Sequence, residues 1–170
     1  MERGACVYDI AGEKSCRIAT KQECSALTTK QNSFYPGYLC SNPQLNTSCV
    51  RQTKTGCVDG KDEVYWYDSC NNAENIYDSN KDKSWNSGLI LSKAESCSPG
   101  SSNANSKTCG NCDYFLGSIC SNASGAVYGN YMCSDLNCKN APANVGTQDR
   151  RNGEAWCVYD GFIGDGKDIV

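Results

Sequence analysis

The sequence predicts a mainly β, disulfide-rich fold of small irregular β modules, with short hairpins, long loops and at most one or two short helices. Three observations predict it. Fourteen of the 170 residues are cysteine and none is histidine, a cysteine content typical of a disulfide scaffold. Asp-Gly pairs precede aromatic and β-branched residues, as they do in hairpins. Sustained helical periodicity is absent, so we expect disulfides to hold the loops.

Local patterns place the individual elements. One helix is expected after Thr20, because Thr20-Lys21-Gln22-Glu23 has the form of a capping box. Strands are expected where β-branched and aromatic residues cluster. In the second strand, alternation places Tyr65 and Tyr67 on one face and Trp66 on the other. The expected strands are residues 5–10, 63–70, 126–133 and 155–163, with a weaker candidate at residues 88–91.

Composition divides the chain into three parts. Residues 98–108 are rich in Ser, Asn and Gly and are expected to form a linker loop. Residues 1–97 then form one or more N-terminal disulfide-rich modules, and residues 109–170 form a C-terminal one. The two flanking parts hold eight and six cysteines. Because both counts are even, each part is expected to close its own disulfides.

A repeated cysteine spacing indicates that a module is used more than once. The pattern C-x7-C-x12-C occurs at Cys49, Cys57 and Cys70, and again at Cys112, Cys120 and Cys133. A second repeat, Asp-Gly-Lys-Asp, precedes a predicted strand at residue 63 but reappears at residues 165–168, near the last residue. We therefore expect the C-terminal module to be truncated and to continue in a longer parent protein.

All fourteen cysteines are expected in disulfides, since thiols in this number point to an oxidising, extracellular compartment. Their connectivity stays open, and the recurring C-x7-C spacing suggests local pairs Cys16/Cys24, Cys49/Cys57 and Cys112/Cys120. The expected disulfide residues are Cys6, Cys16, Cys24, Cys40, Cys49, Cys57, Cys70, Cys97, Cys109, Cys112, Cys120, Cys133, Cys138 and Cys157.

The pair Cys109-Gly110-Asn111-Cys112 leaves two alternatives to ordinary disulfides. A CxxC can exchange thiols, but the expected thioredoxin-like βαβ surroundings are absent from the sequence. Zinc could instead bind the four thiolates of Cys109, Cys112, Cys133 and Cys138. Disulfides are preferred over both, because exported thiols become oxidised.

Two further kinds of site have sequence candidates. Asn46 and Asn122 each begin an Asn-x-Ser/Thr glycosylation motif. Acidic clusters imitate parts of calcium loops, although Asp and Asn more often form turns. Neither cluster completes a calcium motif, so no resident metal or other cofactor is expected. The calcium candidates are Asp78, Asn80, Asp82, Asp160, Asp165 and Asp168.

Charge and residue content exclude several classes of function. A net charge of −3 does not favour binding to nucleic acid or to an anionic membrane. The most apolar stretch is too short to span a bilayer. Without histidine the chain cannot hold a Ser-His-Asp triad, and no carboxylate pair stands out for glycoside hydrolysis. The chain is therefore not expected to be an enzyme.

Three segments carry a resemblance to a known group of proteins: residues 55–70, 108–114 and 152–161. They resemble segments of large cysteine-rich surface proteins predicted in small-genome archaea. The resemblance lies in short motifs and covers mainly residues 49–70 and 108–170. It implies a cell-surface location and supplies no catalytic residue.

The sequence supports two hypotheses about function. The first is a structural subunit of an extracellular filament, sheath or surface layer, in which Tyr-rich strands pair with other copies of the chain or with other surface proteins. The alternative is an adhesion or ligand-binding module of a larger secreted protein. In that case exposed aromatic residues, with Trp66, Trp85 and Trp156 as candidates, would stack on glycans.

Overall fold

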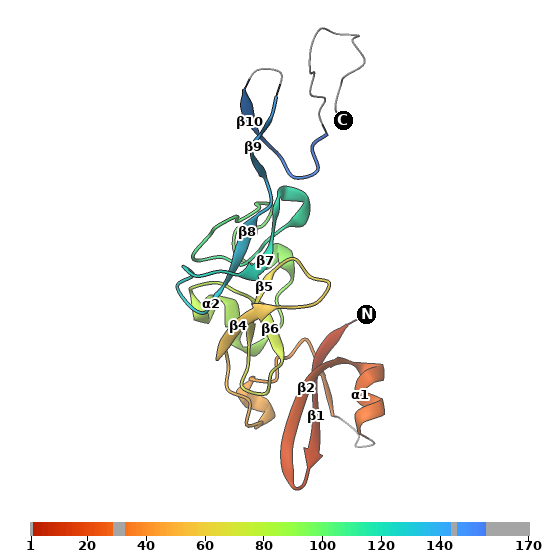
Figure 1. Ribbon diagram of the computed structural model, residues 1–170. Coiled ribbons are helices and arrows are strands. Elements are labelled where there is room, and N and C mark those ends of the chain that lie inside the picture. Colours follow the sequence, from red (N-terminus) through yellow and green to blue (C-terminus); the bar gives the residue numbers. More distant parts are fainter. Residues whose placement is uncertain (1, 29–32, 144–145, 156–170) are drawn as a thin grey trace.

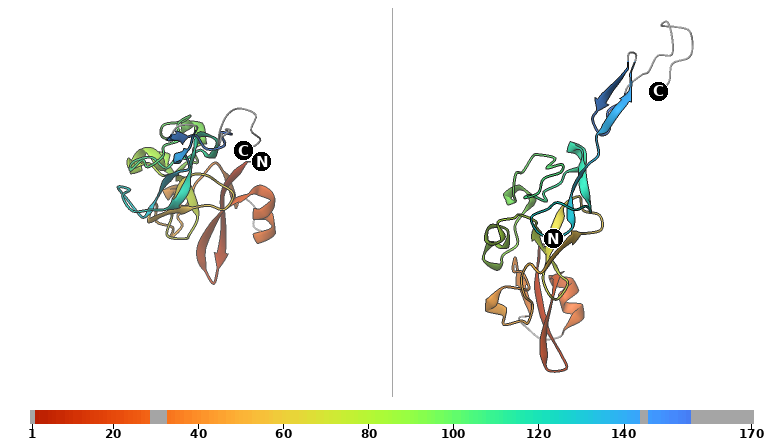
Figure 2. Two further views of the ribbon diagram at one scale, coloured as in Figure 1. Left: turned by 45° about the horizontal axis from the view of Figure 1, so that its top comes forward. Right: turned by 60° about the vertical axis from the view of Figure 1, so that its left-hand side comes forward.

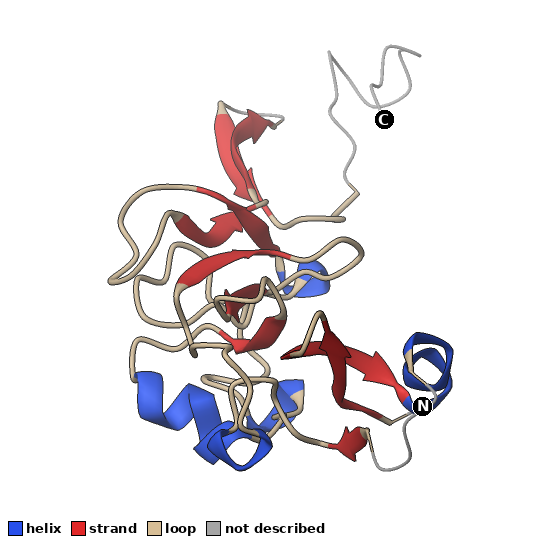
Figure 3. Ribbon diagram, turned by 90° about the horizontal axis from the view of Figure 1, so that it is seen from below, coloured by secondary structure: helices blue, strands red, loops and turns tan. Residues whose placement is uncertain are grey.

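The computed structural model describes residues 2–28, 33–143 and 146–155. Small β-sheets follow one another along the long axis in chain order, and the β9–β10 hairpin projects at the far end (Figures 1 and 2). Loops join the short strands (Figure 3). The predicted mainly β, disulfide-rich fold class is confirmed. The described strands are β1 (Arg3–Ile10), β2 (Glu13–Thr20), β3 (Phe34–Pro36), β4 (Lys54–Cys57), β5 (Val64–Tyr67), β6 (Ala73–Ile76), β7 (Ser118–Asn122), β8 (Tyr131–Asp135), β9 (Cys138–Pro142) and β10 (Thr147–Arg150).

The helices are few and short. The predicted helix is present as α1 (Lys21–Leu27), and its capping box forms as expected. The Thr20 hydroxyl accepts a hydrogen bond from the Glu23 N–H at 3.2 Å, and the Glu23 carboxylate accepts one from the Thr20 N–H at 2.7 Å. The other helical segments are α2 (Lys81–Trp85) and the 3-10 turns η1 (Pro43–Leu45), η2 (Asn86–Gly88), η3 (Lys93–Glu95) and η4 (Tyr114–Leu116).

The N-terminal sheet has the strand order β2-β1-β3. A two-residue turn joins β1 to β2, and both of its residues have positive φ, 51° at Ala11 and 87° at Gly12. This geometry matches the twist of an antiparallel pair. The Cys6–Cys24 disulfide fastens α1 to β1.

The two cysteine repeats form equivalent covalent units. In each repeat the first and third cysteines pair, at a sequence separation of 21 in both cases. The middle cysteines of the two repeats pair with each other. Each repeat also contains an antiparallel pair, β4 with β5 in the first and β7 with β8 in the second. The three bridges are Cys49–Cys70, Cys112–Cys133 and Cys57–Cys120.

The observed pairing corrects two predictions. Local C-x7-C pairing is wrong at all three places where the sequence suggested it. The expectation that the parts on either side of residues 98–108 close separate disulfides is also wrong, because two bridges join them. Those two bridges are Cys57–Cys120 and Cys97–Cys109. Residues 98–108 themselves form no helix or strand.

Asn72 joins the N-terminal sheet to the first repeat. Its side-chain oxygen accepts from the Ile18 N–H at 3.1 Å, and its amide donates to the Cys16 carbonyl at 3.2 Å. Both the backbone N–H and the amide of Asn72 also donate to the Asp68 carboxylate, at 2.8 and 3.0 Å. These two buried polar groups are therefore satisfied by each other and by β2.

Sulfur replaces aliphatic side chains in much of the core. In the cluster beneath the repeats, Val64, Trp66 and Tyr77 pack with the buried cysteines Cys112 and Cys133. The cluster under the N-terminal sheet is similarly built around cysteines. Because the chain has few long aliphatic runs, disulfides and a few aromatic rings fill its interior instead.

The other predicted strands have mixed outcomes. Residues 63–70 contain β5, in which Val64 and Trp66 are buried and Tyr65 and Tyr67 are half-buried, so the predicted alternation is confirmed. The weaker candidate at 88–91 is wrong, since Leu89 makes only an isolated bridge there. Within 126–133 the strand begins at Tyr131. Most of the expected strand at 155–163 lies outside the described residues.

Candidate ligand-binding groove

A groove of about 700 Å³ lies between the two cysteine repeats. The first repeat contributes β4 and the residues just before it, together with the end of β5. The second repeat contributes the β7–β8 turn. The volume is in the range of small-molecule sites. We call it the polar groove, and it is lined by residues 52–57, 66–67, 71, 81, 122 and 128–131.

Gln52 is held in an unusual conformation at the groove. It is 4% exposed and its φ is 50°, in the left-handed region that non-glycine residues seldom adopt. Its N–H donates to Glu74 Oε2 at 2.7 Å, and its amide donates to the Lys81 carbonyl and the Ser84 hydroxyl, both at 2.9 Å. A carbonyl can only accept, so these bonds fix the amide orientation. The amide oxygen Oε1 is then left without a partner.

Thr55 supplies a second unpartnered oxygen. Its side chain is buried in β4, and its Oγ1 makes no hydrogen bond. Gly129 lies directly against it, since a Cβ at that position would come 2.0 Å from Thr55 Oγ1. The φ of Gly129 is 74°, so this position requires glycine for both its backbone and its space.

Tyr128 forms an aromatic wall of the groove and is fixed by Tyr77. The buried Tyr77 hydroxyl accepts from the Tyr128 N–H at 3.2 Å and donates to the Lys107 carbonyl at 3.0 Å. The Tyr128 ring lies 5.8 Å from that of Trp66, centroid to centroid. Tyr128 is 42% exposed, so part of its ring remains open to a ligand.

Tyr67 and several amides complete the lining. Burial, and to a smaller extent the charge of Asp59, raises the pKa of Tyr67. Its phenol therefore stays protonated and donates to the Cys57 carbonyl at 2.9 Å. Three asparagines add side chains that can both donate and accept. They are Asn71, Asn122 and Asn130.

The arrangement is suited to a polyhydroxylated ligand. The exposed side-chain amides of Asn71, Asn122 and Asn130 can exchange hydrogen bonds with hydroxyl groups. Gln52 Oε1 and Thr55 Oγ1 are enclosed by the fold, so a ligand would meet the amides and rings around them rather than these two atoms. The partly exposed ring of Tyr128 offers a surface on which the C–H face of a sugar can stack.

The sequence-predicted calcium residues serve local structure around α2. The Asp78 carboxylate accepts from the Asn80 N–H at 2.8 Å, and the Asn80 side chain caps α2 through the Lys83 N–H at 3.1 Å. Asp82 forms an ion pair with Arg51 at 3.0 Å. These contacts explain the first cluster as turn and cap chemistry. The second cluster, Asp160, Asp165 and Asp168, lies outside the described residues.

The Cys109-Gly110-Asn111-Cys112 motif has a structural role. Cys109 and Cys112 pair with different partners, Cys97 and Cys133, so neither a CxxC disulfide nor the proposed zinc set forms. Gly110 lies between them in contact with Val64 of β5 and with Tyr77, the residue after β6. Its N–H donates to the Tyr77 carbonyl, and its own carbonyl accepts from the Val64 N–H.

Two cysteines fall outside the six disulfides. Cys138, at the start of β9, carries a free and exposed thiol, which corrects its predicted place in a bridge. It begins the two-stranded β9–β10 hairpin, which projects from the repeats (Figure 1). Cys157 lies outside the described residues.

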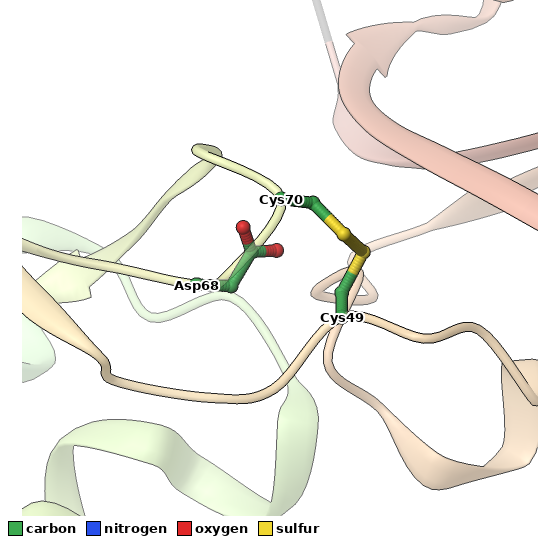
Figure 4. A group of neighbouring side chains, drawn as sticks. All are labelled: Cys49, Asp68 and Cys70. Atoms are coloured by element: carbon green, nitrogen blue, oxygen red, sulfur yellow. A yellow bond between two sulfur atoms is a disulfide. The ribbon is translucent and has the colours of Figure 1, made fainter.

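Cys49, Asp68 and Cys70 form a further cluster, with their ligand atoms within 4.8 Å of one another. Figure 4 shows that the two sulfurs are bonded to each other and that the Asp68 carboxylate lies beside them. A disulfide provides no thiolate, and the Asp68 carboxylate already accepts two hydrogen bonds from Asn72. The cluster therefore lacks the donor chemistry of a metal site.

The tryptophans do not form the expected exposed platform. Trp66 is buried, so its predicted role as an exposed stacking residue is wrong. Trp85 is half-buried, with the Arg51 guanidinium 4.2 Å from its ring centroid. Trp156 lies outside the described residues. Both candidate glycosylation asparagines, Asn46 and Asn122, are exposed, and Asn122 borders the polar groove.

Comparison with protein-family models, with curated proteins and with solved structures found no match. In the described part of the chain, no helix has the length and apolar character needed to cross a membrane. The six disulfides are consistent with an extracellular protein. The chemistry of the polar groove must therefore be inferred from its own side chains.

Proposed function

We propose that this chain is an extracellular adhesion module that binds saccharides in the polar groove. The observation that carries the proposal is the partly exposed ring of Tyr128 in a groove lined by further tyrosines and by exposed asparagines. Gln52 also keeps a left-handed backbone there. Local strain of this kind concentrates at binding and catalytic sites.

Saccharides fit this lining better than apolar ligands do. Their hydroxyls can exchange hydrogen bonds with the exposed asparagine amides. An apolar ligand would cover those amides without satisfying them, which is unfavourable. The disulfides that surround the groove hold its lining in place before the ligand arrives, which reduces the ordering cost of binding.

The test is calorimetric titration of the oxidised chain with a panel of oligosaccharides. Tyr128→Ala and Asn130→Ala are expected to weaken binding at least tenfold. Tyr114→Ala is the matched control, because Tyr114 is 47% exposed but lies outside the groove, and it should bind as the parent does. Absence of binding to every saccharide, or equal loss in all three variants, contradicts the proposal.

A structural subunit is the second candidate, and one observation favours it. The 3-10 turn η4 exposes three consecutive apolar side chains, Tyr114, Phe115 and Leu116, and Phe115 is 89% exposed. Exposed apolar patches commonly mark protein contacts. Sedimentation velocity over a range of concentrations tests this candidate. Association that Phe115→Ser abolishes supports assembly, whereas a monomer at all concentrations contradicts it.

A further inference from the structure

We infer that the saccharide bound in the polar groove is acidic, carrying a carboxylate or sulfate group that pairs with Lys81 and Lys54. This inference rests on the proposed function and specifies its ligand class. The chain as a whole is acidic, with 19 Asp and Glu against 16 Lys and Arg. The groove reverses this balance, because two lysines and no carboxylate are among its lining residues.

Lys81 is held at the groove by aromatic rings. Its Nζ lies 4.9 Å from the Trp66 ring centroid and 4.8 Å from that of Tyr128. It donates one long hydrogen bond of 3.4 Å to the Gln52 carbonyl. Cation–π contacts attract an ammonium without neutralising it. Within the described residues, two of its three N–H groups donate no hydrogen bond, and its charge has no carboxylate partner.

Lys54 adds a second positive charge to the lining of the polar groove. It is the first residue of β4, and its Nζ lies 5.6 Å from the Tyr67 ring centroid. Within the described residues, neither Lys54 nor Lys81 forms an ion pair with a carboxylate. Other cations do so, for example Arg51 with Asp82 at 3.0 Å and Lys93 with Glu63 at 2.7 Å.

The rest of the groove lining explains why the anion should be part of a saccharide. Lys81 Nζ lies 4.8 Å from the centroid of the partly exposed Tyr128 ring, and exposed asparagine amides line the same groove. A sugar acid carries an anionic group beside hydroxyl groups. Its anion can pair with Lys81 while a neighbouring hydroxyl exchanges hydrogen bonds with an asparagine amide.

The test compares three probes by calorimetric titration of the full oxidised chain: a tetragalacturonate, its carboxyl-reduced neutral counterpart and a sulfated galactose tetramer. The acidic probes are expected to bind at least tenfold more tightly than the neutral one, a difference of about 1.4 kcal/mol. The preference should shrink as salt rises, since exposed charge pairs are screened. The relative strength of the two acidic probes distinguishes a carboxylate from a sulfate ligand.

Lysine variants test whether Lys81 causes the preference for acidic probes. Lys81→Met keeps an unbranched side chain against the rings and removes the charge. It should reduce binding of the acidic probes about tenfold and leave binding of the neutral probe unchanged. Lys83→Met is the control, because Lys83 lies on the same short helix, is exposed and does not line the groove. Thermal unfolding of both variants verifies that they fold.

The outcomes separate this inference from the proposed function. Equal affinity for acidic and neutral probes overturns the acidic preference and leaves saccharide binding in place. An equal effect of Lys81→Met and Lys83→Met also overturns it, since the preference would then arise from overall charge. Failure of all three probes to bind contradicts both proposals.

Discussion

The backbone N–H of Gln52 donates a 2.7 Å hydrogen bond to Glu74 Oε2, 22 residues further along the chain. The other carboxylate oxygen of Glu74 accepts from the Ser41 hydroxyl. Burial raises the pKa of Glu74, and these two hydrogen bonds oppose that rise. This buried carboxylate, which does not line the groove, therefore holds the left-handed backbone of Gln52, a residue that does line it.

Glu74→Ala is expected to destabilise the fold and weaken saccharide binding together. It leaves the Gln52 N–H buried without an acceptor, at a cost of about 1–3 kcal/mol. Glu74→Gln keeps one acceptor oxygen and should lose much less of both. Urea unfolding and calorimetric titration measure the two effects. If Glu74→Ala binds as tightly as the parent, Glu74 does not position Gln52.

Gly129→Ala is expected to destabilise the chain by more than Gly60→Ala. Both glycines have nearly the same positive φ, 74° and 73°, but a Cβ at Gly60 meets nothing within 4 Å. Gly60→Ala therefore reports the backbone cost alone, about 1 kcal/mol. Gly129→Ala adds a collision with Thr55 and should also reduce binding in the groove. Equal unfolding midpoints for the two variants would show that the residues around Gly129 move to accommodate the added methyl group without further cost.

The Cys57–Cys120 bridge is expected to stabilise the fold more than the Cys97–Cys109 bridge does. The sequence separations are 63 and 12. By the loop-entropy estimate, removal costs about 4 kcal/mol for the longer loop and about 3 kcal/mol for the shorter. The paired alanine variants can be compared by urea unfolding. Only loss of the longer bridge should also weaken ligand binding, because it joins the two repeats that line the groove.

Protonation of Glu63 is expected to lower the stability of the fold at acidic pH. Burial alone would raise its pKa, but the hydrogen bond and charge of Lys93, at 2.7 Å, outweigh burial and lower it below its ordinary value of 4.5. The folded state therefore binds this proton less tightly than the unfolded chain does. The stabilising contribution is present above about pH 4.5 and is lost as pH falls through the folded-state pKa.

Thermal unfolding of the parent and Glu63→Gln between about pH 7 and pH 3 checks this expectation. The parent should be the more stable protein at neutral pH, and the difference should shrink toward pH 3. Glu13→Gln, which changes an exposed carboxylate on β2, is the control and should follow the parent throughout. A constant difference between the parent and Glu63→Gln contradicts the assigned ion pair.

A glycan on Asn122 is expected to obstruct the polar groove. Asn122 ends β7, is exposed and lines the groove, and it begins one of the two glycosylation motifs. Material from a glycosylating host should bind saccharides less tightly than unglycosylated material, and Asn122→Gln should restore binding. Asn46→Gln is the control, because Asn46 does not line the groove. Equal restoration by both variants would contradict obstruction at Asn122.

The sequence predicted those features that depend on local chemistry. The capping box at Thr20 and the alternation along β5 involve neighbouring residues, and both formed as predicted. The strands that were missed are β2, β3, β4, β6, β7, β9 and β10. They are polar or short, and contacts with their partner strands rather than their own composition make them strands.

The groove could not be predicted because its parts meet through long-range contacts. Gln52 and Lys81 are separated by 29 positions, and Thr55 meets Gly129 across the two repeats. The repeated C-x7-C-x12-C spacing was the available signal. It correctly identified two equivalent units, but spacing alone does not tell that the middle cysteines Cys57 and Cys120 pair with each other.

The overlapping bridges of the two repeats have a mechanical consequence. The loops closed by Cys49–Cys70, Cys57–Cys120 and Cys112–Cys133 interlock along the sequence. Tension applied at the two ends of the chain is therefore carried through sulfur–sulfur bonds across this region. A chain stretched in this way would extend first outside residues 49–133, while the strands that border the polar groove keep their spacing.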